Sequence, residues 1–158
     1  MNYCSECGNR VTLMIPHGDD RPRFVCVGCQ AVHYHNPKMV VGAIPQLDGK
    51  ILLCQRAIQP AKGRWTLPAG YLENGETIAE CAIRETMEEA GAEITDLRPY
   101  AIINLPFIKQ VYFIFRAHLV SDNFQPGTES LAVQLISPEE IPWAELAFSS
   151  MHKVLEVY

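Results

Sequence analysis

Two Cys-x2-Cys pairs near the start of the chain restrict its fold more than any other feature. The pairs are separated by 18 residues, and their members are Cys4, Cys7, Cys26 and Cys29. In a cytosolic chain, two such pairs are typical of a tetrahedral zinc site rather than of disulfides. Residues 1–36 are too few to bury a sufficient core, so we expect the metal to supply folding energy. Because four thiolates fill the coordination shell, we predict a structural zinc with no part in catalysis.

The remaining thiols and the nearby imidazoles are not needed for this site. We interpret three histidines as surface or packing residues, namely His17, His33 and His35. Cys54 and Cys81 lie within apolar stretches, and we expect both to be buried.

The length and composition of the chain indicate a globular protein. Its 158 residues suit one ordinary domain or a modest domain plus a small appendage, and a hydrophobic content of 48% predicts a true core. No apolar run approaches the length of a membrane span, and the N-terminus does not resemble a signal peptide, so we expect a cytoplasmic protein. A net charge of −5 argues against a broad nucleic-acid surface and is compatible with carboxylates that bind cations.

After the ribbon, the pattern changes to a mixed α/β domain that we place at residues 37–158. Strand-like runs at 38–47 and 50–57 flank an Asp-Gly turn signal, which predicts a hairpin. Pro45 suggests that the first of these strands ends there or lies at a sheet edge.

A loop with a short strand is expected at 60–75, and a helix over 77–90 that ends at Gly91. The partly apolar stripe of this helix consists of Ile78, Cys81, Ala82, Ile83 and Met87.

The last part of the chain is predicted to hold three more strands, at 93–106, 109–120 and 130–137. Ser137, with Glu140 three residues later, indicates the capped start of a helix. A C-terminal helix is expected at 149–158.

Three glutamates lie within five positions of the predicted helix: Glu85, Glu88 and Glu89. On a helix they share one face, with Cβ atoms roughly 5–6 Å apart, and their like charges repel. Carboxylates so placed can bind Mg²⁺ or Mn²⁺ through their oxygens. Taken alone, however, such a cluster favours a solvated acidic face.

The spacing around the glutamates is more specific than the cluster. Gly70 is followed by five residues and Glu76, and then by seven residues and the segment 84–92. This pattern resembles the box of the Nudix hydrolases, Gly-x5-Glu-x7-Arg-Glu-U-x-Glu-Glu-x-Gly-U, in which U is bulky and apolar. Every fixed position matches. Thr86 and Ala92 are weaker than usual at the U positions, which pack the helix.

The resemblance covers roughly residues 37–158 and implies the Nudix fold, an α/β/α sandwich around a mixed sheet. It also implies hydrolysis of a diphosphate linked to another group, with catalytic Mg²⁺ or Mn²⁺. By motif position, the metals would be held by Glu85, Glu88, Glu89 and the backbone carbonyl of Ala69.

The same resemblance implies roles for the other charged residues. Arg84 and Glu76 would brace the loop against the helix through their opposite charges. Glu73 is either part of this brace or a solvated loop residue. The general base is one of the box glutamates or Glu129, because family members often supply a glutamate just before a downstream strand.

A cysteine-pair ribbon before a Nudix domain resembles two groups of enzymes. The NADH pyrophosphatases carry a Ser-Gln-Pro-Trp-type motif after the box, which this chain lacks, so NADH stays an alternative. The FAD and ADP-ribose pyrophosphatase group is similar over nearly the full length, in stretches such as "NPKMVVG" and "WTLPAGYLENGE". We therefore expect FAD or ADP-ribose as the substrate, with AMP as one product.

Several residues are candidates for contacts with the substrate, with core packing as the alternative. The aromatic candidates are Trp65, Tyr71, Phe107, Tyr112 and Phe148. Ser149 and Ser150 are either polar contacts or the cap of the last helix. A nucleotide-sensing regulator is a second class of function, although the complete box and the acidic charge argue against it. We also expect a homodimer, with the ribbon as a folding or dimerisation clasp.

Overall fold

The computed structural model describes residues Met1–Tyr158, which divide into two compact units, Met1–Pro37 and Lys38–Tyr158. The first unit contains a three-stranded antiparallel sheet in the order β1 (Val11–Met14), β2 (Arg23–Cys26) and β3 (Val32–His33). Only Cys4, Val25 and Cys26 are buried in it. The ribbon therefore has almost no apolar core, as its length predicts.

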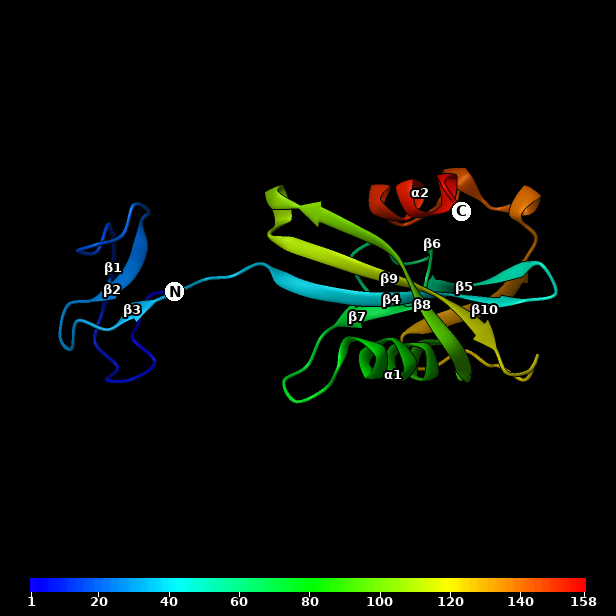
Figure 1. The fold of residues 1–158 in the computed structure, drawn as a ribbon, viewed down its shortest axis with the longest axis horizontal. Helices are drawn as coiled ribbons and strands as arrows, with labels where there is room; N and C mark the ends of the chain where they lie inside the picture. Colours follow the sequence, from blue (N-terminus) through cyan, green and yellow to red (C-terminus); the bar gives the residue numbers. More distant parts are fainter. The chain divides into compact units, whose positions relative to one another are not determined.

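The second unit is built around a mixed sheet of seven strands (Figure 1). Five of them follow the order β10-β5-β4-β9-β8, with β6 paired to β5 and β7 paired to β4. Their bounds are β4 (Lys38–Leu47), β5 (Lys50–Arg56), β6 (Trp65–Thr66), β7 (Ala69–Tyr71), β8 (Ile94–Leu105), β9 (Gln110–Leu119) and β10 (Ser130–Ile136). The β4–β9 pair is parallel and the other pairs are antiparallel.

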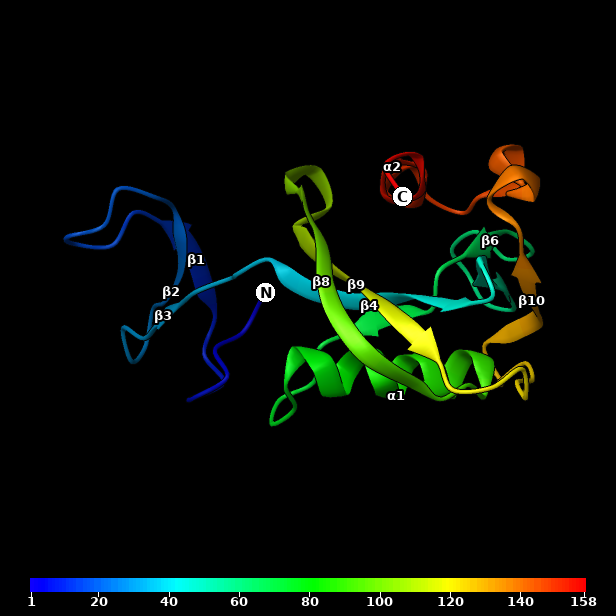
Figure 2. The ribbon, with the colours of Figure 1, turned by 45° about the vertical axis from the view of Figure 1, so that its right-hand side comes forward.

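Helices α1 (Ile78–Ala90) and α2 (Ser149–Glu156) cover opposite faces of this sheet, and Figures 1 and 2 show the three layers. Strand β4 lies in the middle and is buried on both faces. Val40 and Ile44 belong to the cluster that packs on α2, whereas Val41 belongs to a cluster with Cys81 and Ala82 of α1. This alternation follows from the period of two along a strand. The predicted α/β/α sandwich around a mixed sheet is confirmed.

The prediction that Pro45 ends the first strand or marks an edge is wrong, because β4 continues to Leu47 in the middle of the sheet. Proline is tolerated there because its missing N–H would fall in a gap. On one side β4 pairs with β7 only as far as Gly42 and with β5 only from Gln46. The N–H of Ala43 points to that side and donates to the Pro68 carbonyl. Because alternate residues of a strand point the same way, an N–H at Pro45 would point into the gap.

Helix α1 has the boundaries that the sequence predicts. Thr77 and Glu80 form a capping box, and Gly91, with φ of 58°, closes the helix at its C-terminus. The predicted apolar stripe is partly wrong, because Ile83 and Met87 are exposed. The buried face instead uses the small residues Cys81, Ala82, Thr86 and Ala90, together with Glu89.

The predicted hairpin, the later strands and the C-terminal helix are present. Asp48 and Gly49 both have positive φ, as a two-residue hairpin turn requires. The predicted capped helix at Ser137 is wrong: Pro138–Glu140 form only a 3-10 turn (η2), and the Ser137 side chain makes no cap hydrogen bond. Two further 3-10 turns occur at η1 (Pro106–Ile108) and η3 (Trp143–Glu145).

Neither α1 nor α2 combines the length and the apolar character that a membrane crossing requires.

Candidate active site

The four cysteines of the paired motifs converge in the first unit. Their Sγ atoms all lie within 4.8 Å of one another. The separations are 3.7 Å between Cys4 and Cys29, and 3.4 Å between Cys7 and each of Cys26 and Cys29. A tetrahedron with Zn–S bonds of about 2.3 Å has edges of roughly 3.8 Å. The cluster therefore fits a zinc ion with four sulfur ligands.

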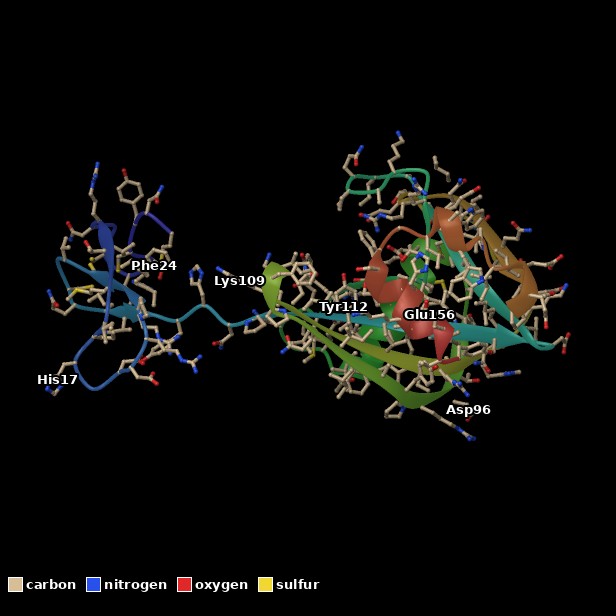
Figure 3. The ribbon with its side chains drawn as sticks, turned by 90° about the horizontal axis from the view of Figure 1, so that it is seen from above. His17, Phe24, Asp96, Lys109, Tyr112 and Glu156 are labelled. Atoms are coloured by element: carbon tan, nitrogen blue, oxygen red, sulfur yellow. The ribbon has the colours of Figure 1, made fainter.

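Neighbouring groups prepare this cluster for a metal. Hydrogen bonds from the backbone and side chain of Asn9 lower the pKa of the Cys7 thiol to about 6, which favours the thiolate that zinc requires. Nε2 of His33 lies 3.2 Å from Sγ of Cys4, so His33 is more than the surface or packing residue we expected. His35 does pack, against Phe24, and His17 is exposed on a loop (Figure 3).

The second unit contains a cavity of about 1060 Å³, lined by residues of α1, α2, the sheet, η1 and four loops. Carboxylates from two distant segments meet in it: Glu85, Glu88 and Glu89 from α1, and Glu129 from the loop before β10. Hard oxygen ligands of this kind suit Mg²⁺ or Mn²⁺, which keep several waters and need few protein ligands. The donor set could therefore hold the expected catalytic metal.

Glu89 is the most buried of these carboxylates, with 7% of the residue exposed. Its Oε2 accepts a hydrogen bond of 3.1 Å from the backbone N–H of Ala69. Burial raises the pKa of Glu89 to about 7, although this hydrogen bond and the charge of Arg56 act in the opposite direction. Glu89 is thus a carboxyl group that can hold a proton near neutral pH.

Arg84 lies at the centre of the carboxylate network. Its Nη2 and Nε bind both oxygens of Glu76, at 2.7 and 3.0 Å, and its Nη1 binds Glu85 at 2.6 Å and Glu88 at 3.1 Å. Nη2 also donates to the carbonyl of Tyr71 at 3.1 Å. The hydrogen bonds from Arg84 lower the pKa of Glu76 to about 2. The ion pair that we expected between the loop and the helix is present.

Gly70 permits the close approach of Glu85 to β7. A Cβ atom at this position would come within 2.2 Å of the Glu85 carboxylate. Burial raises the pKa of Glu85, against the effect of Arg84. The first glycine of the box is therefore required by the packing of a glutamate in the same box.

Glu129 reaches the cavity because the preceding loop docks on the C-terminal end of α1. The N–H of Gly127 donates to the Glu89 carbonyl at 3.1 Å, and a Cβ at Gly127 would overlap the Glu88 carbonyl. The carbonyl of Glu129 accepts from the N–H of Ala57 at 2.8 Å. Backbone contacts on both sides thus fix the segment.

Of the seven candidate substrate contacts in our prediction, six line the cavity, namely Tyr71, Phe107, Tyr112, Phe148, Ser149 and Ser150. Phe107 is 77% exposed on η1, at the same turn as Lys109 in Figure 3. The prediction for Trp65 is not supported, because its side chain packs against the core and lines a separate, smaller pocket. Its backbone carbonyl instead accepts from the N–H of Ala147, just before α2.

Sequence reasoning missed one charged residue of the cavity. Arg56, at the end of β5, is the only arginine or lysine that lines it. Its Nε donates to the Pro60 carbonyl at 2.8 Å, and its guanidinium lies over the Phe148 ring at 5.3 Å. No local motif marks Arg56, because its partners lie in a loop and in a segment near the C-terminus.

Comparisons with known proteins agree with this geometry. The model of the NUDIX domain matches residues 36–157, and the Nudix N-terminal family matches residues 2–35. A NUDIX hydrolase from Nitrosomonas europaea of known structure is 51% identical, with a TM-score of 0.95 over 99% of this chain and 89% of that one.

Curated relatives include the NAD-capped RNA hydrolase NudC of Vibrio atlanticus, which is 28% identical over 132 residues, or 84% of this chain and 47% of the relative. The ADP-ribose pyrophosphatase of Methanocaldococcus jannaschii is 45% identical over 58 residues, which are 37% of this chain and 34% of that protein. The chain spans about half the length of the NudC relatives it matches. Since the NUDIX model matches well over half of the chain and the ribbon family matches the rest, the chain belongs to the Nudix family and carries an N-terminal zinc ribbon.

Proposed function

We propose that this protein is a metal-dependent hydrolase that cleaves the diphosphate of a nucleotide-linked substrate. The observation that carries the proposal is the meeting of Glu85, Glu88, Glu89 and Glu129 in one cavity of nucleotide size. Binding pockets for small molecules have volumes of roughly 300–1,000 Å³, so this cavity is large enough for a dinucleotide.

The proposed roles follow the positions of the side chains. Glu85, Glu88, Glu89 and the carbonyl of Ala69 would hold Mg²⁺ or Mn²⁺, which neutralises the diphosphate and activates water when bound. Arg84 and Glu76 are positioning residues, because Arg84 orients Glu85 and Glu88 through direct hydrogen bonds. The proton of the attacking water passes to Glu129 or to a box glutamate; both sources of base lie in the cavity.

The substrates that we favour are FAD and ADP-ribose, each of which would yield AMP. The similarity to an ADP-ribose pyrophosphatase over 58 residues supports ADP-ribose, and FAD rests on the sequence resemblance alone. Both contain an ADP half joined to a second group, and Tyr71, Phe107, Tyr112 and Phe148 offer aromatic faces in the cavity for the rings.

A second candidate is an NAD-type substrate. The observation in its favour is that several curated relatives that match most of this chain are NAD-capped RNA hydrolases. The missing Ser-Gln-Pro-Trp-type motif argues against it. NAD and NADH contain the same ADP half, so the cavity as a whole suits either class.

A substrate panel tests the proposal. Purified protein with Mg²⁺ or Mn²⁺ would be given FAD, ADP-ribose, NADH, NAD and diadenosine polyphosphates, and products would be separated by chromatography. We expect AMP from FAD or ADP-ribose. If both stay intact and NADH is cleaved, the second candidate replaces the first; if no diphosphate is cleaved, the hydrolase proposal is wrong.

We also propose that the protein is a homodimer in which the ribbon acts as a clasp. Light scattering before and after removal of zinc measures the mass directly. A monomer in both states contradicts the dimer, and a dimer that survives zinc removal contradicts the clasp.

A nucleotide-sensing regulator is the alternative to the hydrolase. DNA binding in a gel shift at moderate salt would favour the regulator.

A further inference from the structure

An imidazole ring lies against the cysteine cluster of the ribbon. Nε2 of His33 is 3.2 Å from Sγ of Cys4. The side chains that converge closely enough to share one ion are the four cysteines, and His33 is not among them. In a tetrahedron with Zn–S and Zn–N bonds of about 2.3 and 2.0 Å, a sulfur and a nitrogen ligand would be roughly 3.5 Å apart. The shorter separation at His33 suits a hydrogen bond to a sulfur that is itself a ligand.

Backbone pairing fixes the strand that carries this ring. Strand β3 ends at His33, and its register with β2 places His33 opposite Phe24. Strand β2 also carries Cys26, so the same ladder positions one cysteine ligand and the imidazole. The next histidine, His35, packs against Phe24 with 5.3 Å between the ring centroids. The half-buried His33 therefore approaches the cluster from a paired strand and not from a loop.

Cys4 and Cys26 are the two buried cysteines of the cluster, and they differ in where their hydrogen-bond donors come from. Sγ of Cys26 accepts from two backbone N–H groups of its own turn, each at 3.4 Å. Sγ of Cys4 accepts one such bond, from the N–H of Glu6 at 3.4 Å. Its second nitrogen neighbour is Nε2 of His33, 29 residues further along the chain. His33 thus offers Cys4 the second donor that Cys26 obtains locally.

The charge of a loaded zinc site gives this donor a role. Four thiolates around one Zn²⁺ have a formal charge of about −2, since four charges of −1 are added to +2. A buried charge is costly unless it is hydrogen-bonded, and hydrogen bonds to an ionised acceptor are the strong ones. A thiolate bound to zinc only accepts, so the ring must donate. Both the neutral ring with its proton on Nε2 and the imidazolium can do so.

We propose that His33 is a positioning residue of the zinc site, which donates from Nε2 to the zinc-bound thiolate of Cys4. The bond joins the first cysteine pair to the last strand of the ribbon and offsets part of the charge on the sulfur. The proposal concerns how firmly the ribbon holds zinc, so it does not rest on the proposed hydrolysis. Replacement of a group that hydrogen-bonds to a metal ligand typically changes metal affinity about 10–100-fold.

Zinc competition in the full-length protein tests the proposal. His33→Phe keeps a planar ring and removes the donor, whereas His33→Gln is the matched control that keeps an N–H group. The zinc affinity of each protein is measured against a chromogenic chelator at one fixed pH. We expect His33→Phe to bind zinc at least about 10-fold more weakly than the natural protein, and His33→Gln to stay close to it. Equal zinc affinity of His33→Phe and the natural protein overturns the proposal, as does an equal loss in both variants.

Nitrogen NMR of the ring in the natural, zinc-loaded protein tests the direction of the bond without any substitution. We expect a proton on Nε2 of His33, which marks a donor. A bare Nε2 overturns the proposal, because that nitrogen would then be an acceptor or a direct zinc ligand. Neither experiment contains a diphosphate, so failure in the substrate panel leaves both results unchanged. Failure of either experiment, in turn, leaves the hydrolase proposal intact.

Discussion

The four cysteines of the ribbon and four of the five glutamates that line the cavity are both sets of side chains that can ligate metals, but the structure arranges them differently. The cysteine sulfurs converge to within 4.8 Å, and they are the only group of three or more such side chains that does so. The glutamates are spread along the cavity, and Arg84 and the backbone of Ala69 bind three of them. A closed sulfur site stabilises a fold, whereas an open oxygen site leaves room for water and substrate.

The difference follows from what surrounds each set. The ribbon has almost no apolar core, so its cysteines must supply the contacts that hold the unit together. The glutamates lie on a helix that packs on a sheet, and the fold there does not need a metal. The cavity can therefore keep an array of repelling carboxylates, because Arg84 compensates part of the charge.

Removal of one of the proposed oxygen ligands is expected to have the largest effect, and this effect should be on activity and not on stability. Glu89→Gln should lower kcat/KM at least about 100-fold, because changes in outer-shell partners of metals already cost about 10–100-fold. The zinc content and the melting temperature should change little. Steady-state hydrolysis over a range of Mg²⁺ concentrations measures the effect.

Glu93→Gln is the matched control, since Glu93 carries the same charge, is exposed and does not line the cavity. Turnover of Glu89→Gln equal to that of the control would show that this glutamate is not part of the reactive site.

Removal of one sulfur ligand should lower the stability of the ribbon, residues Met1–Pro37. Cys26 is fully buried, and Cys26→Ser should release zinc and leave the ribbon open to proteolysis, while residues 38–158 resist. Zinc analysis and limited proteolysis of the full chain measure both results. Cys54→Ala is the control, because Cys54 is buried in the second unit and should not affect zinc. Full zinc occupancy in Cys26→Ser contradicts the assignment.

The smallest expected effect concerns the brace between the loop and α1. The pKa of Glu76 is lowered from 4.5 to about 2, so the folded state favours its ionised form. The stability that this contributes is present above the unfolded pKa and is lost as the pH falls from about 4.5 toward 2. Glu76→Gln should therefore lower the melting temperature slightly at pH 7 and flatten its dependence on pH in that acid range.

Thermal denaturation between pH 7 and 2.5 measures this change. Glu73→Gln, on the same loop, is the control and should keep the acid dependence of the natural protein. A Glu76→Gln profile that falls as steeply as that of the control would exclude the ion pair as its source.

Local sequence patterns predicted the features that depend on neighbouring residues. The spacing of Cys4, Cys7, Cys26 and Cys29 indicates a metal site because each pair needs only a tight turn. The end of α1 was predictable because a C-terminal glycine, Gly91, acts within one helical turn, and the capping box that the structure shows at Thr77 is equally local. The common face of the three box glutamates follows from the helical period alone.

Features that depend on sheet order were decided only by the tertiary structure. Pro45 is tolerated in a central strand because β7 and β5 leave a gap beside it, and Trp65 turns away from the cavity although Tyr71 reaches it. Glu129, Arg56 and the first turn of α2 are far apart in the chain but line one cavity. The sequence by itself thus determined which residues could bind cations, since that depends on local spacing. Which other residues line the same cavity was decided by the packing of distant segments, because such contacts have no fixed period along the chain.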